Sequence, residues 1–240
     1  TSVVRTFRLR LPSWRMLALG LALPLVLHPL TLELSVALQK WFFPQLPAHF
    51  TRQIQAMTDF NQPLWIVLLA FAVAPAICEE LAFRGFILSG YNRTGRTALA
   101  IALSSVTFGV MHMIPHQVFN AALLGIVLGL LAIRSRSLLP CIAFHGIYNA
   151  LGVLHGRVGE ADASWIEGPV RWFIASQEGD LRYQWPMLVV CGLLAFVLLR
   201  WLVKRPDDRA AVAPEITPPT LPRDGRPLQP AMAEQSSGIS

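Results

Sequence analysis

Long apolar runs separated by short polar turns fill most of this chain. The runs cover residues 16–38, 63–88, 97–113, 116–133, 138–154 and 185–203, with Pro115 separating the third from the fourth. A helix needs about 20 predominantly apolar residues to cross the hydrocarbon core of a bilayer, and these runs are of that order. The pattern therefore predicts an all-α, polytopic membrane protein of about six transmembrane helices.

The first run could instead be the apolar part of a signal peptide, because basic residues precede it without an acid: Arg5, Arg8, Arg10 and Arg15. The run is long for a signal peptide, however, and it lacks a clean small-x-small cleavage site. A spanning helix is the favoured interpretation.

Composition supports the membrane class. Of the 240 residues, 54% are hydrophobic and 14% are charged, whereas about a quarter of a soluble domain is charged. The net charge of +6 would suit nucleic acid in a soluble protein. Here the arginines flank apolar runs, so we expect a topological role and no nucleic-acid partner.

Cys78, Cys141 and Cys191 fall inside apolar runs without zinc or redox spacing and are predicted to be small buried residues.

Charge asymmetry predicts the orientation. The 91–96 and 134–136 turns and both ends of the helical region are basic, whereas 156–184 is net acidic, which places both termini in the cytoplasm. The predicted parts are a basic amino terminus (1–15), a first helix and loop (16–62), a helical core (63–154), an extracytoplasmic loop (155–184), a last helix (185–205) and a disordered cytoplasmic tail (206–240).

Two adjacent carboxylates and an arginine interrupt the second apolar run, which has no other charge between residues 64 and 77. Glu80 and Arg84 are four residues apart, the spacing at which an acid and a base pair on one helix face. Glu79 is the carboxylate left over, and Pro75 is expected to kink the helix just before it. We interpret Glu80–Arg84 as a neutralising pair and Glu79 as the reactive group. The alternative is a purely structural network of all three.

Three further polar side chains lie inside later runs. His112 shares a helix face with Phe108, and His145 shares one with Asn149, because each pair is four residues apart. Counted from the cytoplasmic ends, Glu79, His112 and His145 lie about 16, 22 and 12 Å deep. Tilt and the kink could bring them to one level, so a buried polar active site is predicted.

Such a set suits hydrolysis. A carboxylate and an imidazole can take a proton from water, while a second imidazole and an amide stabilise the oxyanion. Alternatively, Glu79, His112 and His145 could hold a divalent metal such as zinc. The His-Glu-x-x-His and Gly-x-Ser-x-Gly motifs are absent from the sequence.

The remaining ionisable residues of the runs are weaker candidates. His116 has helical ligand spacing from His112, but the proline between them is expected to end the helix, so a direct role is disfavoured. His28, His49 and His155 are expected at interfaces or in loops, as structural or solvated residues. Glu33, in the first run, is a weak candidate for a substrate path.

Taken together, these motifs resemble the CPBP group of intramembrane proteases, which includes CAAX prenyl endopeptidases and Abi or bacteriocin-processing relatives. The matching segments are Glu79-Glu80-Leu81-Ala82-Phe83-Arg84, Phe108-Gly109-Val110-Met111-His112 and His145-Gly146-Ile147-Tyr148-Asn149. The resemblance implies that Glu79 and His112 activate water and that His145 and Asn149 stabilise the oxyanion. Glu80, Arg84 and Phe108 would support them. It makes residues 63–154 the catalytic core and leaves open whether the protease is glutamic or metal-dependent.

The resemblance implies an endopeptidase that cleaves a membrane-associated protein or peptide near its carboxy terminus. The Arg- and Pro-rich tail favours a bacterial inner-membrane protein, and this disfavours a prenylated substrate. Two other classes remain: a non-catalytic protein that binds a bacteriocin or another partner, and a proton-coupled transporter that uses Glu79 and the histidines. No inverted repeat of the motifs supports the transporter.

Overall fold

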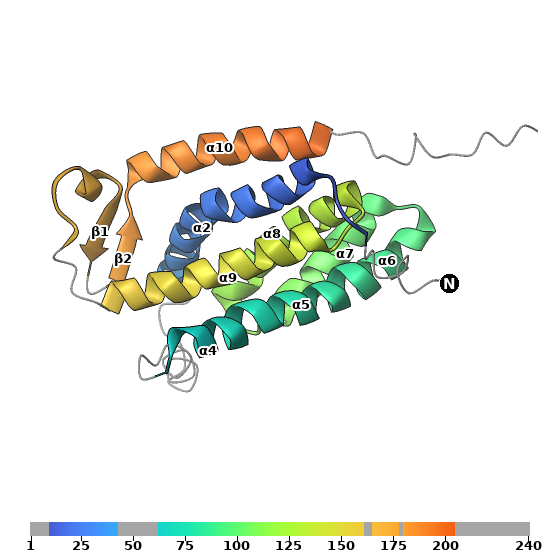
Figure 1. The fold of residues 1–240 in the computed structure, drawn as a ribbon, viewed down its shortest axis with the longest axis horizontal. Coiled ribbons are helices and arrows are strands. Elements are labelled where there is room, and N and C mark those ends of the chain that lie inside the picture. Colours follow the sequence, from blue (N-terminus) through green and yellow to red (C-terminus); the bar gives the residue numbers. More distant parts are fainter. Residues whose placement is uncertain (1–9, 43–61, 161–164, 178–179, 205–240) are drawn as a thin grey trace, which may run out of the picture. The chain divides into compact units, whose positions relative to one another are not determined.

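The computed structural model describes residues 10–42, 62–160, 165–177 and 180–204 as an assembly of helices with one β-hairpin (Figure 1). The predictions made for residues 1–9, for His49 and the rest of 43–61, and for the tail 206–240 lie outside the described residues. The elements are α2 (Trp14–Phe42), α4 (Leu64–Leu68), α5 (Ala74–Glu80), α6 (Leu88–Tyr91), α7 (Thr97–Val110), α8 (Pro115–Ser135), α9 (Leu139–Glu160), β1 (Ile174–Gln177), β2 (Asp180–Tyr183) and α10 (Trp185–Lys204).

Within the described part of the chain, four helices are long and apolar enough to cross a membrane: Trp14–Phe42, Leu64–Thr94, Pro115–Ser135 and Trp185–Lys204. Thr97–Val110 is apolar but has only 14 residues. Leu139–Glu160 is long enough but contains His145, Asn149 and Arg157. The all-helical, polytopic membrane class is thus confirmed, while the number six stays a prediction.

The segment with the acidic motif is one continuous helix, drawn in teal as α4, α5 and α6 in Figure 1. Two π-helical stretches, Leu69–Val73 and Leu81–Ile87, connect these three pieces. Proline has no N–H and cannot bond to the carbonyl four residues earlier, so Pro75 leaves the carbonyl of Phe71 without its usual partner. The first π-helical stretch contains this carbonyl, which becomes important at the site below.

Helices α7 and α8 pack so closely that glycine is required on both sides. A Cβ on Gly109 of α7 would lie 2.6 Å from the carbonyl oxygen of Val118, and one on Gly125 of α8 would lie 3.0 Å from the Cα of Ser105. Small residues that let helix backbones approach are the usual basis of packing within a membrane, where water does not drive association. The α7–α8 pair is therefore a tight unit beside the acidic motif.

Replacing Gly125 with leucine is expected to separate α7 from α8 and to lower the free energy of unfolding by about 1–3 kcal/mol, because the new side chain meets the backbone of Ser105. Thermal unfolding in detergent measures the effect. Gly192→Leu on α10 is the matched control, since a Cβ there meets nothing within 4 Å. Equal midpoints for the two variants would contradict the packing argument.

Helix α2 packs against α8, α9 and α10 and completes the main core. Its Leu23 is fully buried, as are Leu128 and Leu131 of α8, and Phe144 of α9 joins the same cluster. Contact with α9 is close, because a Cβ on Gly20 would lie 2.5 Å from the carbonyl oxygen of Pro140. The first helix is therefore an integral wall of the fold.

The predicted loop 155–184 is more ordered than expected. Helix α9 continues to Glu160, and β1 and β2 form an antiparallel hairpin in which Ile174 pairs with Tyr183. Glu33 of α2, predicted as a weak substrate-path residue, instead forms an ion pair with Arg182 and accepts a hydrogen bond of 2.9 Å from the backbone N–H of Tyr183. The hydrogen bonds from Glu33 raise the pKa of Arg182. This correction makes Glu33 an anchor for the hairpin.

Two further expectations need correction. Cys78 is exposed, because it lies on the outer face of α5, whereas Cys141 and Cys191 are buried as predicted. His28 is 3% exposed in the middle of α2, so it is not an interfacial residue. It lies among aromatic rings, with its centroid 5.5 Å from that of Tyr148 and 5.7 Å from that of His155.

Candidate active site

Glu79, His112, His145 and Asn149 line one cavity of about 500 Å³, although they come from three separate segments. Helix α5 supplies the glutamate, the turn after α7 supplies the first histidine, and α9 supplies the other two. The depths estimated from the sequence differed by about 10 Å. The π-helical stretches, the short α7 and the packing of α9 on α5 allow the four side chains to line the same cavity.

Beneath the cavity, Glu80 and Arg84 form a fully buried ion pair. Arg84 Nη1 donates to Glu80 Oε1 across 2.7 Å, and both side chains have zero exposure. The same oxygen accepts a hydrogen bond of 2.9 Å from His145 Nδ1. The predicted pairing of Glu80 with Arg84 is therefore present, and it also fixes the ring of His145, which the sequence did not indicate.

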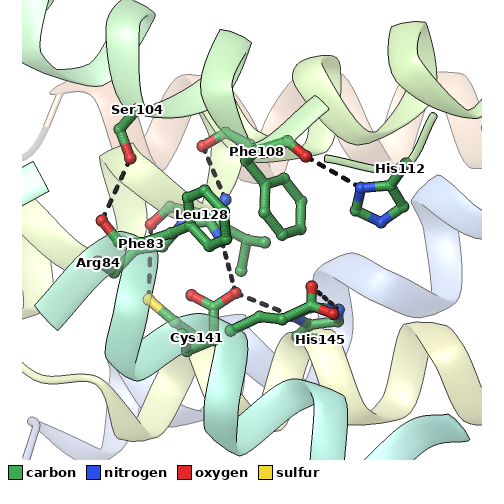
Figure 2. Close-up of polar contacts among 11 residues, drawn as sticks. Phe83, Arg84, Ser104, Phe108, His112, Leu128, Cys141 and His145 are labelled. Atoms are coloured by element: carbon green, nitrogen blue, oxygen red, sulfur yellow. Dashed lines mark hydrogen bonds and ion pairs between the residues drawn. The ribbon is translucent and has the colours of Figure 1, made fainter. Parts of the chain in front are cut away.

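Aromatic packing completes the surroundings of Arg84. Its guanidinium carbon lies 4.2 Å from the ring centroid of Phe108, within the range of a cation–π contact. The Phe108 ring also meets the rings of His112 and His145 edge-on, with centroids 4.9 and 5.8 Å away. Figure 2 shows Phe108 beside both imidazoles, with Arg84 on its other side. Phe108 thus separates the buried ion pair from the cavity.

Glu79 is the carboxylate that the ion pair leaves unused. Its Oε2 atom is buried but has no hydrogen-bond partner among the described residues, and the side chain as a whole is 35% exposed. The nearest basic atom is Nε2 of His145, 3.9 Å away, which is too long for a direct hydrogen bond. A carboxylate that faces a cavity without a committed partner can accept a proton from a bound molecule.

His112 lies just beyond the end of α7, where the sequence predicted a helix that continues to residue 113. The helix ends at Val110, and Met113 adopts a left-handed conformation with φ of 60° before Pro115 starts α8. His112 Nδ1 is 2.9 Å from the carbonyl oxygen of Phe108. Since a carbonyl can only accept, Nδ1 carries the proton, and Nε2 is then free to act as a base when the ring is neutral.

Asn149 is held by the carbonyl that Pro75 leaves without a helical partner. Its Nδ2 donates to the oxygen of Phe71 across 3.2 Å. One amide hydrogen fixes the side chain through this bond, and the second N–H is available to another acceptor. Pro75 and Asn149 are 74 positions apart in the sequence, yet both determine the surroundings of the Phe71 carbonyl.

The residues present do not match a metal site. Among the described residues, no group of three or more His, Cys, Asp or Glu side chains has a geometry that could hold a metal ion. His145 already uses Nδ1 on Glu80, and the predicted trio of Glu79, His112 and His145 does not converge on a common point. The steps proposed below therefore involve protein side chains and water alone.

The cavity also has a wall that sequence reasoning missed. Helix α2 contributes His28, Leu32 and Ser35, and α8 contributes Asn120. Asn120 Nδ2 donates to the Thr31 carbonyl oxygen across 2.8 Å and ties α8 to α2. The sequence feature that could have indicated this wall was His28, a histidine within the first apolar run. The run alone did not show which residues His28 contacts. His116 is buried but does not line the cavity.

Acid–base side chains gathered in a cavity among apolar helices are what a membrane-embedded hydrolase requires. Residues 61–151 match the family model described as type II CAAX prenyl endopeptidase Rce1-like. The helical core thus belongs with the CAAX-type intramembrane proteases, and its apolar helices make the chain an integral membrane protein. The match includes all four predicted catalytic residues but neither α2 nor the hairpin. Neither the curated proteins nor the solved structures give a significant match.

Proposed function

We propose that this protein hydrolyses a peptide bond near the carboxy terminus of a membrane-associated protein or peptide, with Glu79 as the general base. The observation that supports this most directly is the unequal state of the two adjacent glutamates. Glu80 is committed to Arg84 and His145, whereas Glu79 faces the cavity without a hydrogen-bond partner among the described residues.

The charges of Glu79, Glu80 and Arg84 do not cancel, and this supports the presence of one additional proton at the site. Two ionised glutamates and Arg84 leave one surplus negative charge, which is costly at membrane depth when both imidazoles are neutral. One proton on His145 or Glu79 removes that charge. Since His145 Nδ1 donates to Glu80, an added proton resides on Nε2, which faces Glu79. In this state His145 is a hydrogen-bond donor toward the cavity.

The proposed reaction follows from these roles. Glu79 takes a proton from water, and the oxygen of that water attacks the scissile carbonyl. The oxyanion accepts hydrogen bonds from His145 Nε2–H and from the free amide hydrogen of Asn149. When the C–N bond breaks, Glu79 returns the proton to the leaving amine. His112 Nε2 accepts a hydrogen bond from the attacking water and orients it.

Orientation and location are part of the proposal. The basic turns and the acidic hairpin region support cytoplasmic termini, and the composition of the tail supports a bacterial inner membrane. The family description supports a carboxy-terminal cleavage site, and whether the substrate is prenylated is left to the experiment.

The test uses purified protein in liposomes with reporter peptides, with and without an S-farnesylated cysteine, and mass spectrometry of the products. We expect cleavage at one site near the carboxy terminus that persists when a zinc chelator is present. His112→Gln is expected to reduce the rate by about 10²-fold or more. His116→Gln is the matched control, because that imidazole lies close in the sequence and does not line the cavity.

Three outcomes would contradict parts of this proposal. Cleavage that is lost with the chelator and restored by zinc would establish a metalloprotease. A protein that binds the reporters but cleaves none would favour the partner-binding class. Equal rates for His112→Gln and the wild type would remove His112 from the mechanism.

A further inference from the structure

Several helix ends lie together at one end of the helical region. The start of α7 lies beside the end of α8, because a Cβ on Gly129 would lie 3.0 Å from the Ile101 side chain. Arg134 Nη2, also near the end of α8, donates to the carbonyl oxygen of Val203 at the end of α10 across 3.1 Å. Helix α6 ends just before α7 begins, and Figure 1 shows it on the same side.

This end of the fold is basic and has no acidic side chain in the segments that form it. We define the basic end by its cations: Arg93, Arg96, Arg134, Arg136, Arg200 and Lys204. No Asp or Glu occurs in residues 81–159 or 181–204, which contain all of these cations. Clusters of Lys and Arg at the ends of membrane helices attract the anionic head groups of lipids.

A groove of about 370 Å³ lies at the basic end, where the helix with the acidic motif finishes. Its lining consists of Phe86, Ile87, Ser89, Gly90, Tyr91 and Arg93. Phe86 is 67% exposed although it is apolar, and a Cβ on Gly90 would meet nothing within 4 Å. The groove therefore combines open space and exposed apolar surface with one cation.

Arg93 is the cation of this groove. Its side chain is exposed and forms no ion pair with any of the residues that the structure describes. The nearest carboxylate along the chain belongs to Glu80, which is already paired with Arg84. Arg96 is exposed as well, but it does not line the groove. An anion in the groove would thus be bound by Arg93, while Arg96 would add only to the surrounding positive field.

The chemistry of the groove fits an anionic phospholipid. A phospholipid places its phosphate next to acyl chains, as the groove places Arg93 next to Phe86 and Ile87. Hydrogen bonds between arginine and phosphate are charge-assisted and strong. The aromatic ring of Tyr91 is of the kind favoured at head-group level. A zwitterionic lipid would bring its own ammonium group among the cations of the basic end, so a net negative head group is preferred.

We propose that this groove binds one anionic phospholipid from the leaflet at the basic end, with its phosphate on Arg93 and the upper part of an acyl chain against Phe86 and Ile87. The hydroxyl of Tyr91 donates to a second phosphate oxygen. Phe86 and Ile87 belong to the same π-helical stretch as Arg84, so the lipid contacts the helix that carries the buried ion pair. The site is independent of the proposed peptidase activity.

Native mass spectrometry of the full chain counts the bound lipid. The protein is released from micelles that contain equal amounts of dimyristoyl phosphatidylglycerol and dimyristoyl phosphatidylcholine. We expect the wild type to retain one phosphatidylglycerol, with a preference of about tenfold over phosphatidylcholine. Arg93→Gln should reduce this preference to within about twofold. Arg96→Gln is the matched control, because it removes the same charge outside the groove, and it should keep most of the preference.

A second variant fills the groove without changing its charge. Gly90→Leu should lose the bound phosphatidylglycerol while the thermal midpoint in lipid-free detergent stays unchanged, because a Cβ there meets nothing within 4 Å. Gly192→Leu on α10, where a Cβ is equally unhindered, should retain the lipid.

Four results would overturn the proposal. Equal retention of the two lipids by the wild type would remove the preference for an anionic head group. Equal losses in Arg93→Gln and Arg96→Gln, or full retention by Gly90→Leu, would show diffuse attraction to the basic end in place of a groove site. Displacement of phosphatidylglycerol by an equal concentration of inorganic phosphate would show a site for a free anion.

Discussion

Replacing Glu79 with glutamine is expected to reduce the rate of peptide cleavage by about 10²- to 10⁴-fold, the usual contribution of a general base. Glutamine has nearly the same shape but cannot take a proton from water. The carboxylate Oε2 has no hydrogen-bond partner among the described residues and lies 3.9 Å from His145 Nε2, so no hydrogen bond that stabilises the fold is lost. We therefore expect normal insertion into the membrane and an unchanged thermal midpoint, with the loss confined to kcat.

Cleavage of the best reporter in liposomes measures this effect, with initial rates followed by mass spectrometry. Glu167→Gln provides the matched control, because it makes the same chemical change on an exposed residue outside the cavity. Glu79→Asp keeps the carboxylate but withdraws it by one methylene, so partial activity is expected. A Glu79→Gln protein that cleaves at the rate of the wild type would remove Glu79 from the mechanism and with it the proposed protease.

Local rules of helix geometry were enough to predict the most buried part of the site. Glu80 and Arg84 are four residues apart, and at that spacing an acid and a base meet on any regular helix, whatever surrounds it. The apolar run around them gave the second necessary fact, that unpaired charge is costly there. The pair could therefore be predicted without knowledge of the tertiary structure, and the remaining carboxylate, Glu79, followed by elimination.

Contacts that depend on backbone irregularity could not be predicted in this way. The bond from Asn149 to Phe71 exists because Pro75 leaves a carbonyl without its helical partner, but the sequence does not say which distant side chain will donate to it. Similarly, a continuous helix through His112 was the simplest interpretation of the apolar run. The helix in fact ends at Val110, and the left-handed Met113 then redirects the chain.

The contribution of α2 and the hairpin depended on long-range packing. His28 had no neighbour in the sequence that could reveal its burial, because its partners Tyr148, His155 and Tyr183 are more than 100 residues away in the chain. The ion pair between Glu33 and Arg182 is equally distant. Apolar runs predict helices one at a time, whereas the identity of facing helices depends on details of packing that periodicity does not contain.

The second large effect is expected at Arg84. Replacing this residue with methionine removes the cation but leaves Glu80 ionised in a site with zero exposure. Breaking a buried ion pair in this way costs about 3–5 kcal/mol of the free energy of unfolding. Denaturant titration of the purified protein in mixed micelles measures this loss. Arg182→Met is the matched control: its partner Glu33 retains a bond from a backbone N–H, and the pair is partly exposed, so a smaller loss is expected.

The double variant Glu80→Gln/Arg84→Met separates stability from activity. With both charges removed, no uncompensated ion remains, so most of the lost free energy of unfolding should return. Cleavage should stay low, because a neutral amide in place of the Glu80 carboxylate would no longer balance a proton on His145, and His145 would lose its role as a donor toward the oxyanion. If the double variant recovered both stability and activity, the buried pair would only hold the helices together. If it recovered stability alone, the pair would be shown to act on the reaction through His145.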